Sequence, residues 1–563
     1  MAGKNKVLLS ILLLFIILRV YRINNPLTDY IGLRQVPTAD IARNFCIKGA
    51  DILYPQYSTG GGRDGYIEIE FQILPYITSM VYRIIGTHET AGRVVALLFS
   101  VMGFVFLYML LGELGFENHC RLLIMLIYSL LPQNIYLSRC FMPEPVMLSL
   151  ITIFAYYAVR LNNTGNKRYI ILSSLSGALA VLSKAPAAYI LLLFFPLVIL
   201  NRKYLRGRFL LTALIIMLIL APPFLYYFHS YRLGKMYSSV GIWETGHGHI
   251  SKWADLPVLT GRLFWNTLTN RLYNYTITPV LFPFFISGIW ILLKKREFII
   301  LFWSAGVLSS FVILARGTIA NPYYLYPLTP LVAVFSGAGL FSFGRILRKD
   351  AVIMLIIGIM GVYSWLYISE YYIPEDITLR MGKAINSLSA RDEKVLTVLH
   401  SSLYYSGRYG YLDKTLNPER INHYKELGVR WFGYPLTIQE KYDNQSRRKI
   451  QKLSAIYNTA AIDEDFIVFD LLSPPGDSGQ SFDNSSIKGL FGTKEDSLSI
   501  SFEAINPSDM PILTQIRRQG LNRGYFFLPP GKSRINIKMP AYPHLHYLEI
   551  LPKQKGRFFL LQT

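Results

Sequence analysis

The sequence has few charged residues and even fewer acidic ones. Asp, Glu, Lys and Arg make up 16% of its 563 residues, against about 25% in soluble proteins. Hydrophobic residues reach 52%, and the mean hydropathy is +0.32. This composition excludes a disordered chain, a collagen and a disulfide-rich mini-domain. It also argues against a purely soluble enzyme.

Cysteine is scarce as well. Cys46, Cys120 and Cys140 are too few and too scattered for a disulfide framework or a zinc site, so we expect buried thiols. Against 57 Lys and Arg stand only 35 Asp and Glu, which leaves a net charge of +22. Such an excess is typical of nucleic-acid or membrane-surface binding, and the position of the charges decides between them.

Long apolar segments predict a membrane protein, because a spanning helix needs about 20 mainly apolar residues. The first segment follows Lys4 and Lys6 and lacks a small-residue cleavage site, so we interpret it as an uncleaved helix with a cytoplasmic N-terminus. About eleven spans are expected: 6–23, 93–112, 119–136, 143–160, 169–182, 185–200, 209–227, 276–293, 298–315, 324–343 and 351–370.

The charged connections support this topology. With the N-terminus inside, four of the five inner loops are strongly basic, as the positive-inside rule requires: 160–168, 202–208, 294–296 and 345–349. We therefore predict an integral, multi-pass protein of a bacterial-type inner membrane, with its C-terminal domain outside. The basic excess then reports topology, and no RNA-binding or helix-turn-helix signature indicates nucleic acid.

The predicted fold class is an α-helical polytopic membrane protein with C-terminal extramembrane α/β and β modules. Residues 1–373 form the transmembrane domain, whose outer loops 24–92 and 228–275 are amphipathic and predict juxtamembrane helices. Residues 374–474 predict a small α/β domain, with a turn at 411–413. A polar linker, 475–487, precedes a β-rich module at 488–563.

Several polar residues of the outer side stand out from the apolar pattern. Glu144 directly precedes an apolar helix; it is either an N-terminal cap or a paired group in a wet cavity. Lys184, between two apolar runs, either snorkels to the surface or binds an anion. Tyr323 and Tyr324, after Arg316, belong either to the aromatic belt or to a phosphate site.

A set of motifs resembles a known family. They are DYIGLRQVPTADIARNF (29–45), ILYPQ (52–56), IEIEF (67–71), SRCFMPEPVML (138–148), LSKAPA (182–187) and NPYYLYPLTP (321–330). Together they resemble the glycosyltransferase family 39-like proteins. These belong to the C-type membrane glycosyltransferase superfamily, with the protein O-mannosyltransferases and lipid A aminoarabinose transferases.

The resemblance implies a transferase that uses a polyprenyl-phosphate sugar. Asp29 matches the acidic residue that follows the first helix in the family, and Arg34 matches the arginine of the same motif. Asp40 is an alternative match for that acidic residue, unless it faces solvent on a helix. Glu70 and Glu144 match the other two acidic positions, and Tyr323 and Tyr324 match a tyrosine motif for the lipid phosphate. Pro37 stands where relatives have aspartate, and Phe71-Gln72 where aminoarabinose transferases have Lys-Pro. Cations would compensate: Arg34, Arg63, Lys184, Arg271 or Arg316.

The chemistry needs a base for the acceptor hydroxyl and cations for the departing phosphate. We expect Asp29 and Glu144 as the catalytic residues, with Asp29 as the base. Glu144 and Glu70 would position the acceptor, hydrogen-bond the sugar or orient a phosphate-binding cation. The donor-phosphate and substrate site comprises Arg34, Glu70, Lys184, Arg316, Tyr323 and Tyr324. In-line attack would invert the anomeric carbon. No cofactor is required, and a divalent metal is compatible with the reaction, although no metal ligands are assigned. The acceptor is a lipid, glycan or protein hydroxyl, and membrane lipid is a further partner.

Two other functions compete with this one. A transporter or flippase places its polar site near the bilayer midplane, with internal repeats; here the acids lie at one surface. A glycan polymerase or ligase of another fold would need an outer loop rich in Arg and His. The loop 228–275 has Arg232, His247, His249 and Arg262, so this alternative stays open.

Overall fold

The computed structural model describes two compact units, residues 1–379 with 409–411, and residues 380–408 with 412–563. The described residues are 2–61, 65–200, 203–237, 254, 256–347, 350–436, 444–463, 465–474 and the backbone of six strands between 497 and 561. Arg63, the middle of the loop 228–275 with His247 and His249, and the predicted linker 475–487 lie outside them.

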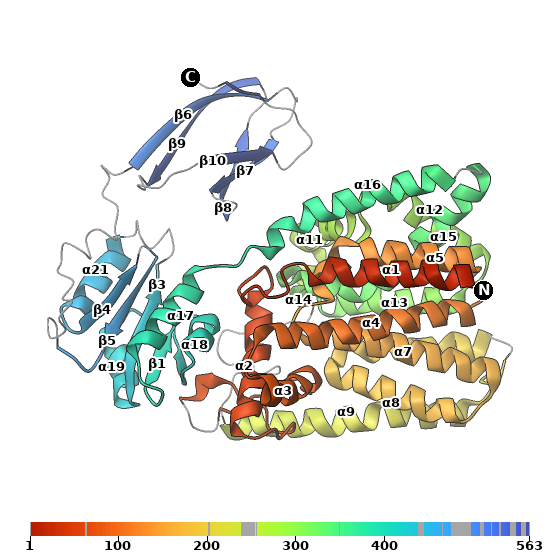
Figure 1. Ribbon diagram of the computed structural model, residues 1–563, viewed down its shortest axis with the longest axis horizontal. Coiled ribbons are helices and arrows are strands. Elements are labelled where there is room, and N and C mark those ends of the chain that lie inside the picture. Colours follow the sequence, from red (N-terminus) through yellow and green to blue (C-terminus); the bar gives the residue numbers. More distant parts are fainter. Residues whose placement is uncertain are drawn as a thin grey trace. The chain divides into compact units, whose positions relative to one another are not determined.

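The first unit is a bundle of helices that run side by side (Figure 1). Its α-helices are α1 (Ala2–Val20), α2 (Gly32–Lys48), α3 (Ile73–Ile85), α4 (Glu89–Glu113), α5 (Asn118–Leu130), α6 (Pro132–Leu137), α7 (Pro143–Thr164), α8 (Arg168–Ser183), α9 (Phe209–Tyr237), α10 (Leu256–Thr260), α11 (Arg262–Arg271), α12 (Phe282–Lys294), α13 (Phe298–Ile313), α14 (Ala315–Ala320), α15 (Thr329–Leu347) and α16 (Asp350–Ile368). Short 3-10 or π segments are η1 (Ser58–Gly60), η2 (Ala185–Leu193), η3 (Pro196–Leu200), η4 (Leu272–Ile277), η5 (Pro322–Leu328) and η6 (Ser369–Tyr372).

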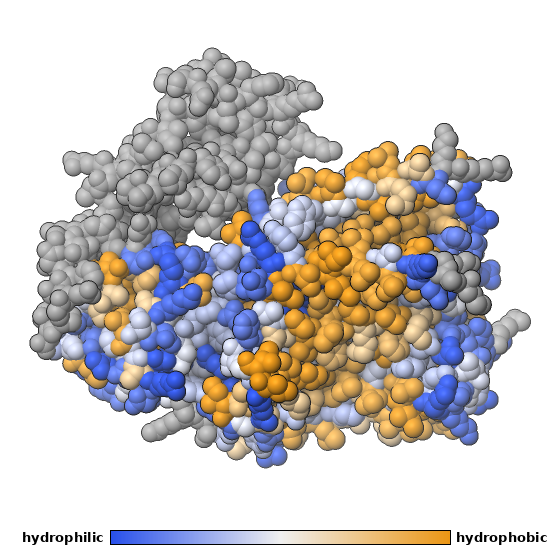
Figure 2. All heavy atoms as spheres, viewed as in Figure 1, coloured by the Kyte–Doolittle hydropathy of each residue, from blue (hydrophilic) through white to orange (hydrophobic). Residues whose placement is uncertain are grey.

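Each of the eleven predicted spans lies on helix. Within the described residues, five helical segments are long and apolar enough to cross a bilayer alone: α4, α7, α9, η5 with α15, and the segment that begins with α16. The bent pair Arg262–Ile277 and Phe282–Lys294 adds a sixth if it is one span. Figure 2 shows a broad apolar surface over these helices, with Leu210 90% exposed. Such a surface needs lipid to cover it, so the chain is an integral membrane protein.

Breaks in the helices explain why other spans are short. Pro132 separates α5 from α6, and Lys184, with extended backbone, separates α8 from η2. A break inside an apolar region exposes backbone groups, which is tolerated where protein buries them. Glu144 in the first turn of α7 and Tyr323 and Tyr324 in η5 lie at similar discontinuities. The polar residues of interest therefore cluster at helix ends.

The segment 24–92, predicted as an outer loop, contains the helices α2 and α3. Helix α2 contains Pro37 and yet buries polar side chains, among them Gln35 and Asn44. Asp40 is also buried and accepts hydrogen bonds from the Ser58 N–H and hydroxyl, both at 2.7 Å. It does not face solvent, and its bonds instead hold the loop segment at η1 onto α2.

The second unit contains an α/β sheet with the strand order β1-β3-β5-β4, in which β1 and β3 are parallel and the pairs β3–β5 and β4–β5 are antiparallel. Its elements are most of α17 (Ile377–Leu388), β1 (Lys394–Thr397), α18 (His400–Ser406), α19 (Pro418–Glu426), β3 (Val429–Pro435), α21 (Asn444–Ser454), β4 (Asn458–Asp463) and β5 (Phe466–Asp470). The short strand β2 (Gly410–Leu412) has residues 410 and 411 in the first unit. The predicted α/β character is confirmed. The turn predicted at 411–413 is wrong, because β2 occupies most of it as an edge strand.

Six further strands form two three-stranded sheets, β10-β7-β8 and β11-β6-β9, all of whose pairings are antiparallel. They are β6 (Ser497–Asn506), β7 (Ile512–Arg518), β8 (Leu521–Leu528), β9 (Gly531–Pro540), β10 (Leu548–Pro552) and β11 (Phe559–Leu561). These pairings match the alternation of apolar and polar residues in this part of the sequence.

Candidate active site

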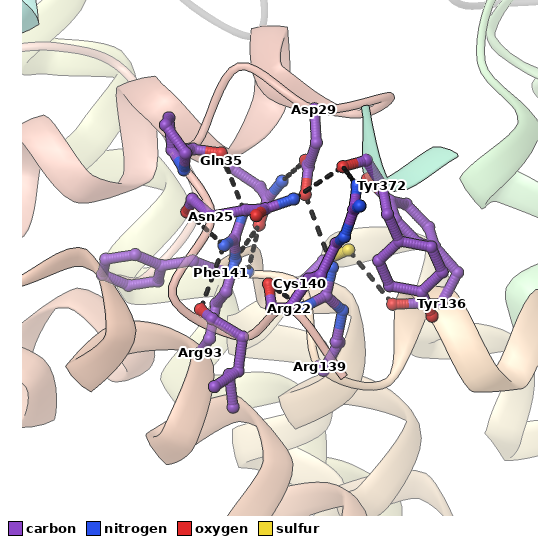
Figure 3. A network of polar contacts seen from close by, with 12 residues as sticks. Arg22, Asn25, Asp29, Gln35, Arg93, Tyr136, Arg139, Cys140, Phe141 and Tyr372 are labelled. Atoms are coloured by element: carbon purple, nitrogen blue, oxygen red, sulfur yellow. Dashed lines mark hydrogen bonds and ion pairs between the residues drawn. The ribbon is translucent and has the colours of Figure 1, made fainter. Parts of the chain in front are cut away.

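Asp29 lies in a closed polar group that we call the Asp29 cage, formed by Asp29, Gln35, Arg93 and Arg139 (Figure 3). Its Oδ2 is 2.8 Å from an Arg93 Nη and 3.5 Å from an Arg139 Nη. Its Oδ1 accepts a hydrogen bond of 2.5 Å from the Gln35 amide. The side chains of Asp29, Arg93 and Arg139 are 0% exposed. The carboxylate is thus fully enclosed.

The cage ties together three separate parts of the first unit. Arg93, near the start of α4, also donates to the backbone carbonyl of Ile23 at 3.1 Å. Arg139, between α6 and α7, donates to the carbonyls of Tyr21 and Arg22. The cage therefore fixes the segment after α1 against α4 and the turn before α7.

Asp29 lies at the centre of a buried ion network. A base must come within hydrogen-bond reach of the proton that it abstracts. In this structure both Asp29 oxygens have partners, and no part of the side chain is exposed. The role of Asp29 as the general base stays a prediction.

A second polar group contains the remaining acids. We call it the Glu144 cluster, and it consists of Arg34, Glu70, Glu144, Lys184, Tyr323 and Tyr324. Arg34 of α2 forms an ion pair with Glu70, in the extended segment before α3. Burial lowers the pKa of Arg34, but the charges of Glu70 and Glu144 outweigh it and raise the pKa well above its ordinary value. Arg34 is therefore a permanent cation beside two carboxylates.

Glu144 and Lys184 form the other ion pair of the cluster. Glu144 is 1% exposed, and one carboxylate oxygen, Oε2, is buried without a hydrogen-bond partner in the described part of the chain. The Nε of Arg34 is in the same condition. Buried polar atoms without partners are rare and costly in proteins. Arg139 Nε of the cage is a further atom of this kind, but on Glu144 the atom is a carboxylate oxygen, which can bond a polar ligand.

The two tyrosines complete the cluster. The Lys184 ammonium lies 4.8 Å from the Tyr323 ring centroid and 4.7 Å from that of Tyr324. The rings stack on each other at 5.3 Å. Tyr324 packs against Gly317 of α14, where an added Cβ would come within 3.0 Å of the ring. Their contact with an ammonium ion is more specific than a place in the aromatic belt.

Five of the six residues predicted for substrate and phosphate binding lie in this cluster together with Glu144. The sixth, Arg316, is half-buried in α14 and is not among the contacts that define the cluster. Arg271 donates to the Thr318 carbonyl at 2.5 Å instead. Arg93 and Arg139 were not predicted as functional. The signal for both is that arginine is unusual at the end of a span that is predicted to face outward.

Gln35 connects the cage with the cluster. It follows Arg34 in α2 and bonds Asp29, and its Oε1 accepts from the backbone N–H of Phe141 at 3.0 Å. Phe141 lies three residues before Glu144. The cage thereby fixes the backbone on both sides of the cluster.

An apolar groove with a cavity volume of about 550 Å³ lies between α8 with η2 and the helix α9. Its lining includes Phe224, Tyr227 and Tyr231 of α9, and Ala185, which follows Lys184 in the sequence. A groove of this kind suits an apolar chain. In contrast, no three His, Cys, Asp or Glu side chains among the described residues form a group that could hold a metal ion.

Comparison with known proteins supports the resemblance seen in the motifs. Residues 73–227 match the sequence model of the family described as dolichyl-phosphate-mannose-protein mannosyltransferase. This match covers Glu144 and Lys184. An uncharacterised protein of Aquifex aeolicus is 25% identical over 305 residues, which are 53% of this chain and 57% of that protein. The alignment thus spans little more than half of either protein.

Solved structures show the same fold. ArnT from Cupriavidus metallidurans, bound to undecaprenyl phosphate, matches with a TM-score of 0.61 and 11% identity, over 83% of this chain and 98% of its own. The oligosaccharyltransferase of Archaeoglobus fulgidus, in complex with Zn and sulfate, has a TM-score of 0.55 and 14% identity, over 79% and 69%. The predicted C-type glycosyltransferase fold is therefore confirmed.

Proposed function

Because this chain has the fold of the C-type membrane glycosyltransferases and matches a mannosyltransferase family model, we propose that it transfers a sugar from a polyprenyl-phosphate donor to a hydroxyl acceptor. The observation that carries the proposal is the convergence of Arg34, Glu70, Glu144, Lys184 and the two tyrosines from five separate segments. Two carboxylates, two cations and two phenols supply the groups that this reaction requires.

The donor would bind with its phosphate at Lys184 and its prenyl chain in the groove beside Ala185. Lys184 and Arg34 supply positive charge, and the phenol hydroxyls can donate hydrogen bonds to phosphate oxygens. Undecaprenyl phosphate is the ligand of the ArnT structure, which supports this class of donor. The groove supports a long apolar tail, since its described lining is almost entirely apolar.

The reaction then needs one proton transfer and one bond exchange. The acceptor oxygen attacks the anomeric carbon while its proton passes to a carboxylate oxygen of Glu144. The bond between that carbon and the phosphate oxygen breaks, and the electron pair stays on the phosphate, where the cations stabilise it. The products are a glycoside of inverted configuration and the polyprenyl phosphate. We assign the base to Glu144 rather than Asp29, because Glu144 has an oxygen without a partner.

Glu70 would hold Arg34 in place rather than react, since it forms an ion pair with that guanidinium. We place the reaction in residues 1–373, on the non-cytoplasmic side of the membrane. The basic loops at 160–168 and 294–296 support this orientation, because positive loops stay inside. Lipid, glycan and protein hydroxyls remain as acceptors.

The test is a transfer assay on purified protein in liposomes, with radiolabelled polyprenyl-phosphate hexoses and pentoses and a crude envelope extract as the source of acceptor. We expect at least one donor to be consumed, with release of polyprenyl phosphate and label on the acceptor fraction. Glu144→Gln should abolish the release, whereas Glu113→Gln should not. Glu113 is a matched control, because it pairs with Arg160 at the far end of α4. Failure of every donor would reject the proposal.

A further inference from the structure

We infer that the donor phosphate itself activates the base, by drawing Lys184 away from Glu144. Glu144 then accepts a proton only when a donor is bound, and the donor must bind before the acceptor reacts. This inference rests on the proposed function, and it adds an order of events that the function alone does not require.

The first observation is that the cluster neutralises its own charges. Glu144 pairs with Lys184, and Glu70 pairs with Arg34. In this arrangement the Lys184 ammonium occupies one carboxylate oxygen of Glu144.

The second observation is that the side chains of Glu144 and Lys184 differ in how freely they can move. Glu144 is held in the first turn of α7 and is 1% exposed. Lys184 lies on an extended residue between two helices, and 14% of its side chain is exposed. A lysine carries its charge on a flexible four-carbon stem. The lysine, not the glutamate, is the partner that can move.

The third observation is where Lys184 can go. Its ammonium lies over both tyrosine rings at 4.7 and 4.8 Å, and aromatic faces stabilise a cation without holding it in one position. The donor phosphate is a diester with one negative charge shared by two oxygens, and it competes with the single charge of Glu144 for this ammonium ion. Once Lys184 turns to the phosphate, Glu144 remains buried with one oxygen already lacking a partner.

The consequence is that neither Glu144 oxygen has a cation beside it when the acceptor reacts. An isolated charge is costly to bury, so the carboxylate is free to take up a proton. The acceptor hydroxyl supplies that proton as its oxygen attacks the anomeric carbon. Without a donor, Glu144 stays paired.

The experiment measures binding of undecaprenyl phosphate, the reaction's lipid product, to the purified full-length protein in detergent by isothermal titration calorimetry. We expect Glu144→Gln to bind at least about 10-fold more tightly than the unaltered protein, which is about 1.4 kcal/mol, because Lys184 no longer has a competing carboxylate. Lys184→Met should bind about 10-fold more weakly. The double variant should bind no more tightly than Lys184→Met, and Glu113→Gln should bind as the unaltered protein does.

A second readout uses the unaltered protein. Titrations in buffers of different ionisation enthalpy report protons exchanged on binding. We expect proton uptake by the unaltered protein that exceeds that of Glu144→Gln; if that variant does not fold, the absence of uptake by the unaltered protein overturns the inference. Equal or weaker binding by Glu144→Gln also overturns it. Both results leave the proposed function intact. That function is rejected only if no donor is consumed in the transfer assay.

Discussion

The Asp29 cage and the Glu144 cluster both contain buried carboxylates beside cations, but the carboxylates differ in how many partners they have. In the cage, one carboxylate has three partners and no exposed surface. In the cluster, Glu70 pairs with Arg34 and Glu144 pairs with Lys184, and Glu144 Oε2 lacks a partner within the described residues. Each group also contains one buried guanidinium Nε without a partner among those residues, on Arg139 in the cage and on Arg34 in the cluster. The two groups therefore differ at their carboxylates, since both oxygens of Asp29 are bonded and one oxygen of Glu144 is not.

The two groups are also coupled. Gln35 bonds Asp29 on one side and the backbone before Glu144 on the other, while its neighbour Arg34 belongs to the cluster. An unsatisfied site needs such support, because its own contacts do not hold it in place. The four variants that follow separate the two roles.

The largest expected effect is on stability, from Asp29→Asn. This change leaves two fully buried guanidinium groups without a carboxylate, which typically costs about 3–5 kcal/mol of unfolding free energy. The midpoint of thermal unfolding in detergent should therefore fall sharply, while transfer per folded molecule should largely persist. An unchanged midpoint with loss of transfer would place Asp29 in the chemistry after all.

Glu144→Gln should show the opposite result. The amide has the same shape but cannot accept the proton, so transfer should fall by about 100-fold or more. The thermal midpoint should stay within the range of the Glu113→Gln control, since the cluster holds less of the scaffold. Transfer at the unaltered rate would rule out Glu144 as the base.

Tyr324→Phe tests whether a phenol contacts the phosphate. A hydrogen bond to a charged group contributes about 1.5–3 kcal/mol, so donor affinity should fall about 10- to 100-fold, with the ring and its contact to Lys184 retained. Tyr108→Phe is the control, because that hydroxyl bonds Asn118, in the helix that follows α4. If both variants bind the donor equally well, the Tyr324 hydroxyl does not contact the phosphate, and Tyr324 contributes only packing.

Most of the helical architecture could be predicted, because hydropathy and the sidedness of charge are local properties of the sequence. The predicted spans between 93 and 343 all fall on helices. Helix α2 could not be fully predicted, since it buries polar residues and contains Pro37. Its stability depends on partners such as Ser58 and Arg93, which are distant in sequence.

The site was predictable as a set of residues but not as a set of pairs. Glu144 and Lys184 stand out because each interrupts an apolar region, yet their ion pair joins positions 40 residues apart. Asp29 and Glu70 look alike in sequence, as acids of one outer loop. Only the three-dimensional arrangement shows that Arg93 and Arg139 enclose the first, whereas Arg34 joins the second to the cluster.

The smallest expected effect comes from Gly317→Ala, which leaves every charged group of both regions intact. The added Cβ would lie 3.0 Å from Tyr324 Cζ and 3.2 Å from its hydroxyl oxygen, so the phenol must shift by a few tenths of an ångström. Small displacements of positioning groups reduce rates, and we expect transfer to fall about 2- to 5-fold. Helix stability should rise slightly, because alanine favours helix over glycine by about 1 kcal/mol. Gly358→Ala is the control, since nothing lies within 4 Å of its added Cβ. Equal transfer by both variants would mean that the position of the Tyr324 phenol is not critical, and the cluster would then act through its charges alone.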